Sequence, residues 1–138
     1  MLVIKANHVS QKVSVQKALD AWGEENPESK ELIEPNRYNG LMVEIKQISK
    51  EVYLESMARC RQSVEGWEAE IEVYRAMSML VASGVEQLHG LQDEEGQEVF
   101  LSSENGKLDG DSINLLHDND LLLDMWRLVR HYNELTAL

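Results

Sequence analysis

The residues that could do metal chemistry in this chain do not form a complete set. Glu86 and His89 have the Glu-x-x-His spacing that puts both side chains on one face of a helix, as in di-iron carboxylate bundles. Such a centre needs a second pair and two further glutamates, and no acidic residue stands three positions before His117 or His131. We therefore interpret Glu86 and His89 as a surface or hinge pair.

Calcium sites are the other metal chemistry that the acidic turns suggest. A calcium loop needs oxygen ligands at alternate positions, glycine at the sixth and glutamate at the twelfth. Alignment on Gly110 puts Leu116 at the twelfth position, and alignment on Gly96 puts Leu91 at the first. Neither loop could close around an ion, so we expect no bound metal and no cofactor.

The chain has one cysteine, Cys60, that could serve as a catalytic nucleophile. Cys60 falls on an apolar stripe of a predicted helix, which is typical of a core residue, and a lone cysteine excludes an intramolecular disulfide. The chain has no Gly-x-Ser-x-Gly elbow, phosphate-binding loop or dinucleotide fingerprint. We expect a protein that is not an enzyme, with an active site built from scattered carboxylates as the alternative left open.

Charge limits the partners. The 138 residues carry a formal net charge of −12, which opposes attraction to nucleic-acid backbones and anionic lipid surfaces. Between Ala76 and Trp126 eleven acidic residues face one basic residue, Lys107. No run approaches the roughly 20 apolar residues of a membrane span. These features predict a cytoplasmic protein that binds neither nucleic acid directly nor a membrane.

Two long apolar stripes dominate the predicted structure. Leu41, Ile45, Ile48 and Val52 begin a stripe at helical spacing that continues to Val64. A second stripe, from Trp67 to Val85, follows after a break at Gly66, so we expect an antiparallel helical hairpin.

Shorter elements complete the expected fold. The spacing predicts a strand at 2–4, a short helix over 15–22, a β-hairpin around the acidic turn 92–96, a short helix capped by Asp111 and a closing helix over 120–135. Pro27 and Pro35 make 23–39 a linker or arm. The sequence thus predicts a mainly α single domain over 1–138, with a long helical hairpin, one short β-hairpin and a closing C-terminal helix.

A set of flexible and aromatic side chains could hold a protein partner. Methionines adapt to varied apolar surfaces, and aromatic residues are enriched in binding hot spots. The candidate partner-binding residues are Met77, Met79, Met125, Trp126 and Tyr132. The same residues could instead fill the core, or they could be hidden by self-association into a homo-oligomer.

The C-terminal half also resembles a known family. Its order is a helix ending in MSMLVASGVEQL, the turn HGLQDEEGQEV, a polar loop, NLLHDND and LLLDMWRLVRHYNEL. This order, over residues 70–138, resembles small tail-assembly proteins of long-tailed bacteriophages. The resemblance implies a chaperone in the host cytoplasm that binds the apolar helical tape-measure protein and aids tail morphogenesis without catalysis.

The alternative function comes from the acidic residues. A face containing Asp93, Glu94 and Glu95 could imitate nucleic acid and inhibit a DNA-binding protein or host defence enzyme by occupying its basic groove. Such a mimic needs carboxylates at phosphate-like spacing, which is a property of the tertiary structure.

Overall fold

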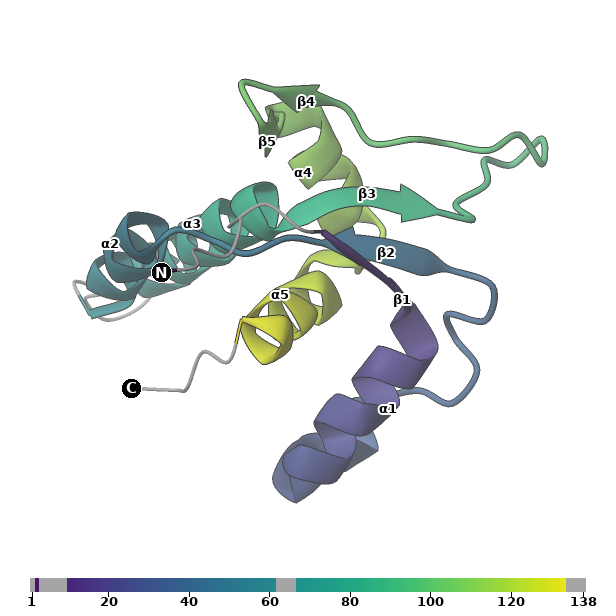
Figure 1. The fold of residues 1–138 in the computed structure, drawn as a ribbon, viewed down its shortest axis with the longest axis horizontal. Helices are drawn as coiled ribbons and strands as arrows, with labels where there is room; N and C mark the ends of the chain where they lie inside the picture. Colours follow the sequence, from purple (N-terminus) through teal and green to yellow (C-terminus); the bar gives the residue numbers. More distant parts are fainter. Residues whose placement is uncertain (1, 3–9, 62–66, 134–138) are drawn as a thin grey trace.

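The computed structural model describes residues 2, 10–61 and 67–133 and has a three-stranded antiparallel sheet at its centre (Figure 1). The strands are β1 (Gln11–Ser14), β2 (Met42–Ile45) and β3 (Val85–His89), in the order β1-β2-β3. Val13 pairs with Val43, and Val43 pairs with Leu88. Val43 and Leu88 are fully buried, whereas Met42 and Glu44 are partly exposed, so β2 alternates as a strand with one covered face does.

The described residues form five α-helices around the sheet, and two of these helices begin at a side-chain cap. Ser14 caps the first helix by accepting from the Lys17 N–H, and Asp109 caps the fourth by accepting from the Ser112 N–H at 2.9 Å. The helices are α1 (Val15–Glu25), α2 (Lys50–Arg61), α3 (Trp67–Gly84), α4 (Gly110–Asp118) and α5 (Leu122–Tyr132), with a 3₁₀ helix η1 (Pro27–Leu32) and a small ribbon of β4 (Ser103–Glu104) and β5 (Lys107–Leu108). One core joins the buried side chains of sheet and helices.

The prediction of one long helix from Leu41 to Val64 is wrong. Residues 42–45 form the central strand, and the helix α2 begins only at Lys50. The spacing of Leu41, Ile45 and Ile48 is compatible with a helix, but the alternation around Val43 also fits a strand. Pairing with β1 and β3 decides between them, because it satisfies the backbone groups of β2 on both sides. Val64 lies outside the described residues.

The predicted β-hairpin around the acidic turn is also wrong in its pairing. β3 pairs with β2 instead of with the segment that follows it. Across the turn there is a single isolated bridge, between Gln92 and Glu98. The fold is therefore mixed α/β, with a three-stranded and a two-stranded sheet, and is not mainly α with one β-hairpin.

Other predicted elements are found with changed ends. The helices predicted over 15–22 and 67–85 are confirmed as α1 and α3, and α5 covers most of the predicted closing helix. Asp109, not Asp111, caps α4. Of the strand predicted at 2–4, only residue 2 is described, and it is not in a strand.

The segment 23–39, predicted as a linker or arm, contains the end of α1, the helix η1 and a docked turn. Pro27 stands at the first position of η1, where its missing N–H costs nothing. The Gln16 side chain holds the turn, because its Oε1 accepts from the Tyr38 N–H at 2.9 Å and its Nε2 donates to the Glu34 carbonyl at 3.1 Å. The segment is thereby fixed against α1.

The helices α3 and α5 cross closely at Gly84. A Cβ built on Gly84 would lie 2.5 Å from Cγ1 and 2.9 Å from Cγ2 of Val129. This close approach sets how α5 lies against α3. One turn further on, Asn133 ties the end of α5 to the segment that follows β2, because its Oδ1 accepts from the Ile48 N–H at 2.9 Å, while its Nδ2 donates to the Val129 carbonyl at 2.8 Å.

We expect Gly84→Ala to lower the free energy of unfolding by about 1–3 kcal/mol, because the added methyl group would overpack against the buried Val129 side chain. Chemical denaturation monitored by circular dichroism measures the change. Gly110→Ala is the control, since a Cβ there meets nothing within 4 Å, and it should leave stability unchanged or raise it by up to about 1 kcal/mol. Equal stability of the Gly84→Ala variant and the wild type would contradict the close crossing.

Candidate functional site

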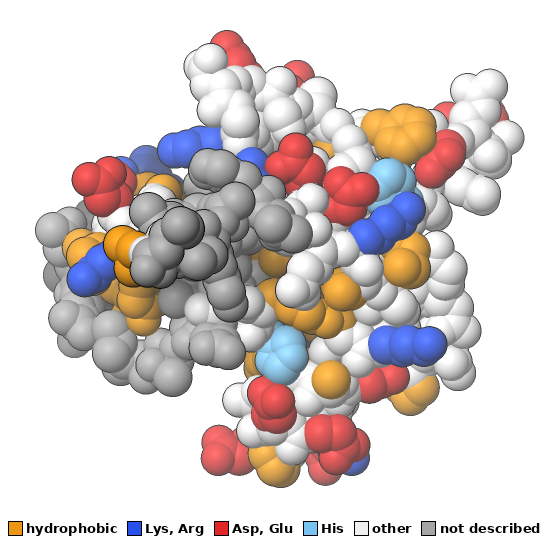
Figure 2. All heavy atoms as spheres, in the orientation of Figure 1, with side chains coloured by type: hydrophobic (Ala, Val, Ile, Leu, Met, Phe, Trp, Pro, Cys, Tyr) orange, Lys and Arg blue, Asp and Glu red, His pale blue; other side chains and the backbone are white. Residues whose placement is uncertain are grey.

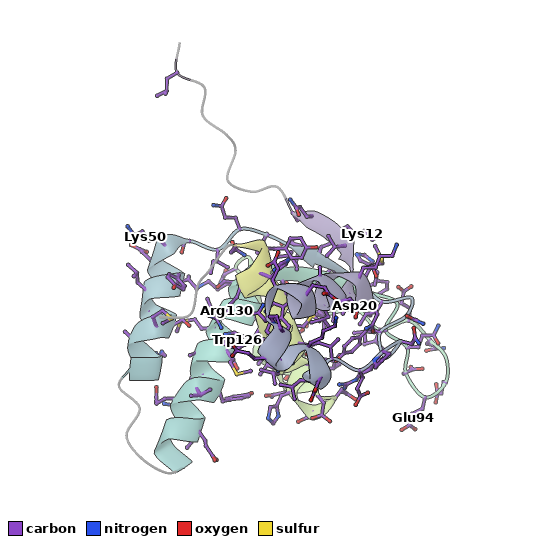
Figure 3. The ribbon with its side chains drawn as sticks, turned by 90° about the horizontal axis from the view of Figure 1, so that it is seen from below. Lys12, Asp20, Lys50, Glu94, Trp126 and Arg130 are labelled. Atoms are coloured by element: carbon purple, nitrogen blue, oxygen red, sulfur yellow. The ribbon has the colours of Figure 1, made fainter. Side chains whose placement is uncertain are left out.

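A groove lies between the first half of α3, the start of α5 and η1. In Figure 3, which views the molecule from below, α3 and α1 lie on opposite sides of α5 and point away from each other. The groove has a volume of about 770 Å³. It is lined by Leu32, Arg37, Glu70, Val73, Tyr74, Met77, His117, Asp120, Leu122, Leu123, Asp124 and Arg127, a set called the groove below.

The residues that α3 contributes to the groove stand at helical spacing and are mostly apolar. On α3 its lining residues stand at positions 70, 73, 74 and 77, which is one face over two turns. Three of its apolar side chains are exposed: Val73 and Leu123 at 43% each and Leu32 at 63%. Apolar side chains from three separate elements thus face one solvent-filled space, an arrangement that marks binding surfaces in soluble proteins.

The charged part of the groove is organised around the Asp124 carboxylate. Asp124 is only 8% exposed and accepts hydrogen bonds from the Tyr38 hydroxyl and, at 2.8 Å, from Nη1 of Arg127. Nη1 of Arg37 lies 3.9 Å from its other oxygen. These four residues, called the Asp124 cluster below, satisfy a buried charge that would otherwise be very costly to desolvate.

The two arginines of the Asp124 cluster are held to different degrees. The Arg127 side chain is 11% exposed and stacks over the Trp22 ring of α1, with the guanidinium carbon 5.0 Å from the ring centroid. Arg37 is 33% exposed, donates to the Asp120 backbone carbonyl at 3.3 Å and lies over the Tyr38 ring. Arg37 is therefore the more accessible cation of the groove.

Tyr38 has the clearest electrostatic perturbation. Burial, the hydrogen bond to Asp124 and the negative charge of Asp124 all raise the pKa of its hydroxyl far above the ordinary 10.0. The hydroxyl therefore stays protonated at neutral pH and donates to the carboxylate.

His117 and Asp120 form the edge of the groove at the α4–α5 turn. The His117 ring meets the Tyr74 ring edge-on, with centroids 5.0 Å apart. Asp120 has a φ of 57°, a left-handed conformation that aspartate and asparagine tolerate better than most residues. Its carbonyl is thereby placed to accept from Arg37.

The structure does not bring the sequence-predicted partner-binding residues together. Met77 lines the groove, whereas Met79 lines a second hollow of about 610 Å³ with α4 and β5 residues. Met125 is fully buried, and Tyr132 is half-buried beside His131. Trp126 is half-buried under the Arg130 guanidinium at 4.5 Å, on the side of α5 toward the α2–α3 hairpin (Figure 3).

Sequence reasoning missed the residues that define the groove, chiefly Val73, Leu123 and the Asp124 cluster. Asp124 and Arg127 stand three apart on one helix, a spacing that could have indicated an ion pair. No local signal points from Asp124 to Tyr38, 86 positions earlier in the chain.

The predicted acidic face is divided between a structural and a free part. The Asp93 carboxylate accepts from the Glu95 and Gln97 N–H groups at 2.9 Å each, which fixes its own turn. Glu94 and Glu95 are exposed, and Figure 3 shows Glu94 at the outer end of that loop. On the face in Figure 2, acidic and basic side chains are interspersed.

Glu86 and His89 each pair with another side chain and do not come together as a pair of metal ligands. Both belong to the strand β3 instead of a helix, and each is engaged by a different residue of the neighbouring segment. Glu86 pairs with Lys46 at 3.1 Å, and His89 pairs with Glu44 at 3.0 Å. Over residues 10–61 and 67–133, the structure holds no cluster of three metal-ligating side chains. The Cys60 side chain is not among those described.

Comparison with known proteins adds no relative. No protein-family model, no curated protein and no solved structure matches the chain. Within the described part of the chain, no helix has the length and apolar character needed to cross a membrane.

We expect Tyr38→Phe to destabilise the protein by about 1–3 kcal/mol at neutral pH, because the buried Asp124 carboxylate loses a hydrogen-bond donor. The raised pKa of Tyr38 adds a pH signature. Since the folded state keeps this proton longer than the unfolded state, wild-type stability should fall as the pH rises above 10.0. The fall should be smaller in the variant. Urea unfolding at neutral and alkaline pH measures both effects.

Tyr132→Phe is the matched control, since Tyr132 is half-buried on α5 outside the Asp124 cluster. It should change stability at neutral pH less than Tyr38→Phe does. A Tyr38→Phe variant with wild-type stability at both pH values would contradict the proposed hydrogen bond.

Proposed function

We propose that this protein is a non-catalytic binding protein whose groove holds an apolar helical segment of another protein. The observation that carries this proposal is the exposure of Leu32, Val73 and Leu123 around one groove. Burying such side chains against a partner is favourable, at about 25 cal/mol per Å² of apolar surface. Without a partner the same side chains stay in water.

The dimensions of the groove favour a helix as its occupant. The lining stretch of α3, from position 70 to 77, rises roughly 10 Å at 1.5 Å per residue. An amphipathic helix with apolar residues at i, i+3, i+4 and i+7 would present a matching stripe over two turns. It would lie on the outward side of α5, beside the exposed face of Leu123.

Charge favours a different protein over a second copy of this one. Two copies would bring formal charges of −12 together, and the repulsion between them opposes self-association. A neutral or basic helix meets no such repulsion. We therefore favour a heterologous partner.

The tape-measure protein of a long-tailed bacteriophage is the partner that the family resemblance suggests. The region that carries the resemblance forms most of α3, then β3, the acidic turn, the β4–β5 ribbon, α4 and α5, and most of the groove lining comes from its helices and the turn between α4 and α5. In this proposal the protein covers apolar tape-measure helices in the host cytoplasm during tail assembly. Its net negative charge would keep the loaded complex soluble.

The groove's own chemistry supports binding over catalysis. Asp124 is buried, accepts hydrogen bonds from Tyr38 and Arg127 and has Arg37 at 3.9 Å, an arrangement that serves to stabilise its charge within the protein. Arg127 is committed to Asp124 and Trp22. Asp124 and Arg127 are therefore occupied in holding the groove's shape.

The nucleic-acid mimic is the less favoured function. Asp93, Asp109 and Asp124 use their carboxylates in internal hydrogen bonds, and Glu86 pairs with Lys46. Glu98 also accepts from the Gly90 N–H at 3.4 Å, and Asp118 lies 3.5 Å from Nδ1 of His117, so that six of the eleven acids between Ala76 and Trp126 are already engaged. Fewer charges remain to imitate a phosphate backbone.

Leu123 is an exposed apolar residue of the groove wall. Leu123→Glu should weaken binding of a synthetic amphipathic helix with leucines at i, i+3, i+4 and i+7 by about tenfold or more, because a charge would be placed on the apolar wall. Fluorescence anisotropy with the labelled peptide measures this. Leu54→Glu, at a comparably exposed leucine on α2 outside the groove, should bind as the wild type does. Equal effects of the two substitutions would exclude the groove as the binding site.

The salt dependence of binding affinity distinguishes a helix-binding protein from a nucleic-acid mimic. A helix held by apolar contacts should keep its affinity within about threefold between roughly 50 and 200 mM salt, whereas a mimic held in a basic groove should lose affinity steeply. Titration of the peptide across this range measures the slope. Glu94→Lys with Glu95→Lys should leave peptide affinity little changed. A steep slope abolished by these reversals would instead support the mimic.

A further inference from the structure

The charged side chains of the groove differ in whether they already have a partner. Arg127 donates to the Asp124 carboxylate at 2.8 Å and stacks over the Trp22 ring. Nη1 of Arg37 lies 3.9 Å from the same carboxylate, and the Arg37 side chain also donates to the Asp120 backbone carbonyl at 3.3 Å. The cations of the groove are therefore engaged within the protein.

Two further carboxylates line the groove and are not engaged. Glu70, on α3, and Asp120, in the turn between α4 and α5, are both exposed. Among the residues that the structure describes, neither carboxylate has a hydrogen-bond or ion-pair partner, since Arg37 contacts the backbone of Asp120 and not its side chain. A partner can therefore meet these two charges without breaking an existing contact.

The charge balance of the lining has the same sign. Its three carboxylates outnumber its two guanidinium groups, and the whole chain carries a formal charge of −12. Unpaired carboxylates in a field of this sign attract cations and repel anions. Lysine and arginine suit such positions, because their aliphatic stems can lie along an apolar wall while the charged end reaches a carboxylate.

We infer that the groove selects a cationic amphipathic helix. The apolar stripe of that helix lies on the apolar wall of the groove, and lysine or arginine residues beside the stripe meet Glu70 and Asp120. This inference rests on the proposed function and adds the charge of the bound segment. An acidic helix with the same apolar stripe is the partner that the groove rejects, because its carboxylates would face those of the lining.

The experiment compares two peptides that carry leucines at i, i+3, i+4 and i+7 and differ only beside this stripe, where one has lysines and the other glutamines. Lysine and glutamine have nearly equal helix propensity, so the two affinities report on charge. In fluorescence anisotropy at about 50 mM salt, the wild type should bind the lysine peptide about fivefold more tightly, as expected for two partly exposed ion pairs. This ratio, called the lysine preference, should shrink at about 200 mM salt, because exposed ion pairs are screened.

Two double variants with the same change in net charge test where the attraction arises. Glu70→Gln with Asp120→Asn removes the unpaired charges of the groove, and asparagine also tolerates the left-handed backbone of Asp120. This variant should reduce the lysine preference to below about twofold. Glu94→Gln with Glu95→Gln removes two exposed charges of the acidic turn outside the groove, and it should keep the lysine preference.

The glutamine peptide separates the inference from the function on which it rests. Equal affinity of the wild type for the two peptides would overturn the inference and leave helix binding intact. An equal loss of the lysine preference in both double variants would also overturn it, because the net charge of the protein would then attract the peptide instead of the groove carboxylates. Absence of binding by both peptides would overturn the proposed function, and the inference with it.

Discussion

The buried carboxylate of Asp124 is the interaction on which the arrangement of the helical layer depends. It lies on α5 but takes hydrogen bonds from Tyr38, in the turn that leads into β2, and from Arg127, which in turn stacks on Trp22 of α1. A charge this buried must be satisfied, because leaving it unpaired would cost several kcal/mol. The requirement ties together three segments that are distant in the chain.

The groove is a consequence of that arrangement. The Asp124 cluster holds the 33–41 turn against the start of α5, while the crossing of Gly84 and Val129 holds α3 against its later turns. The first half of α3 extends away from α1, as Figure 3 shows, and Val73 and Leu123 remain uncovered. A surface of this kind has rigid elements on its sides, so a partner helix would meet a largely preformed site.

Fewer carboxylates are free to act as surface charges in the folded protein than the composition suggests. The net charge of −12 is real, but several carboxylates are structural: Asp93 closes a turn, Asp109 caps α4 and Asp124 organises the groove. The hydrogen bonds that Asp109 accepts from the Ser102 hydroxyl and the Ser112 N–H also lower its pKa. The available negative charge is thus more dispersed than a count of acidic residues indicates, which favours solubility over imitation of a polyanion.

Local patterns determined several features of this protein from the sequence alone. The helical periods of α1, α3 and most of α5, the charge balance and the incompleteness of the metal and nucleophile motifs are all readable within a few residues. Amphipathic spacing is a local property, since residues three and four apart lie on the same helix face whatever surrounds them. The position of Met77 on the groove-lining side of α3 belongs to this class.

Only the tertiary structure decided the rest. Residues 42–45 became a strand because β1 and β3 pair with them from both sides, and β3 turned away from the following segment for the same reason. The groove depends on Arg37 and Tyr38 meeting Asp124 across more than eighty positions of sequence. Such contacts form between side chains with no local signal of their own, because their free energy depends on what folding buries around them. The same holds for Met125 and Met79, whose burial and placement were set by the elements that pack against them.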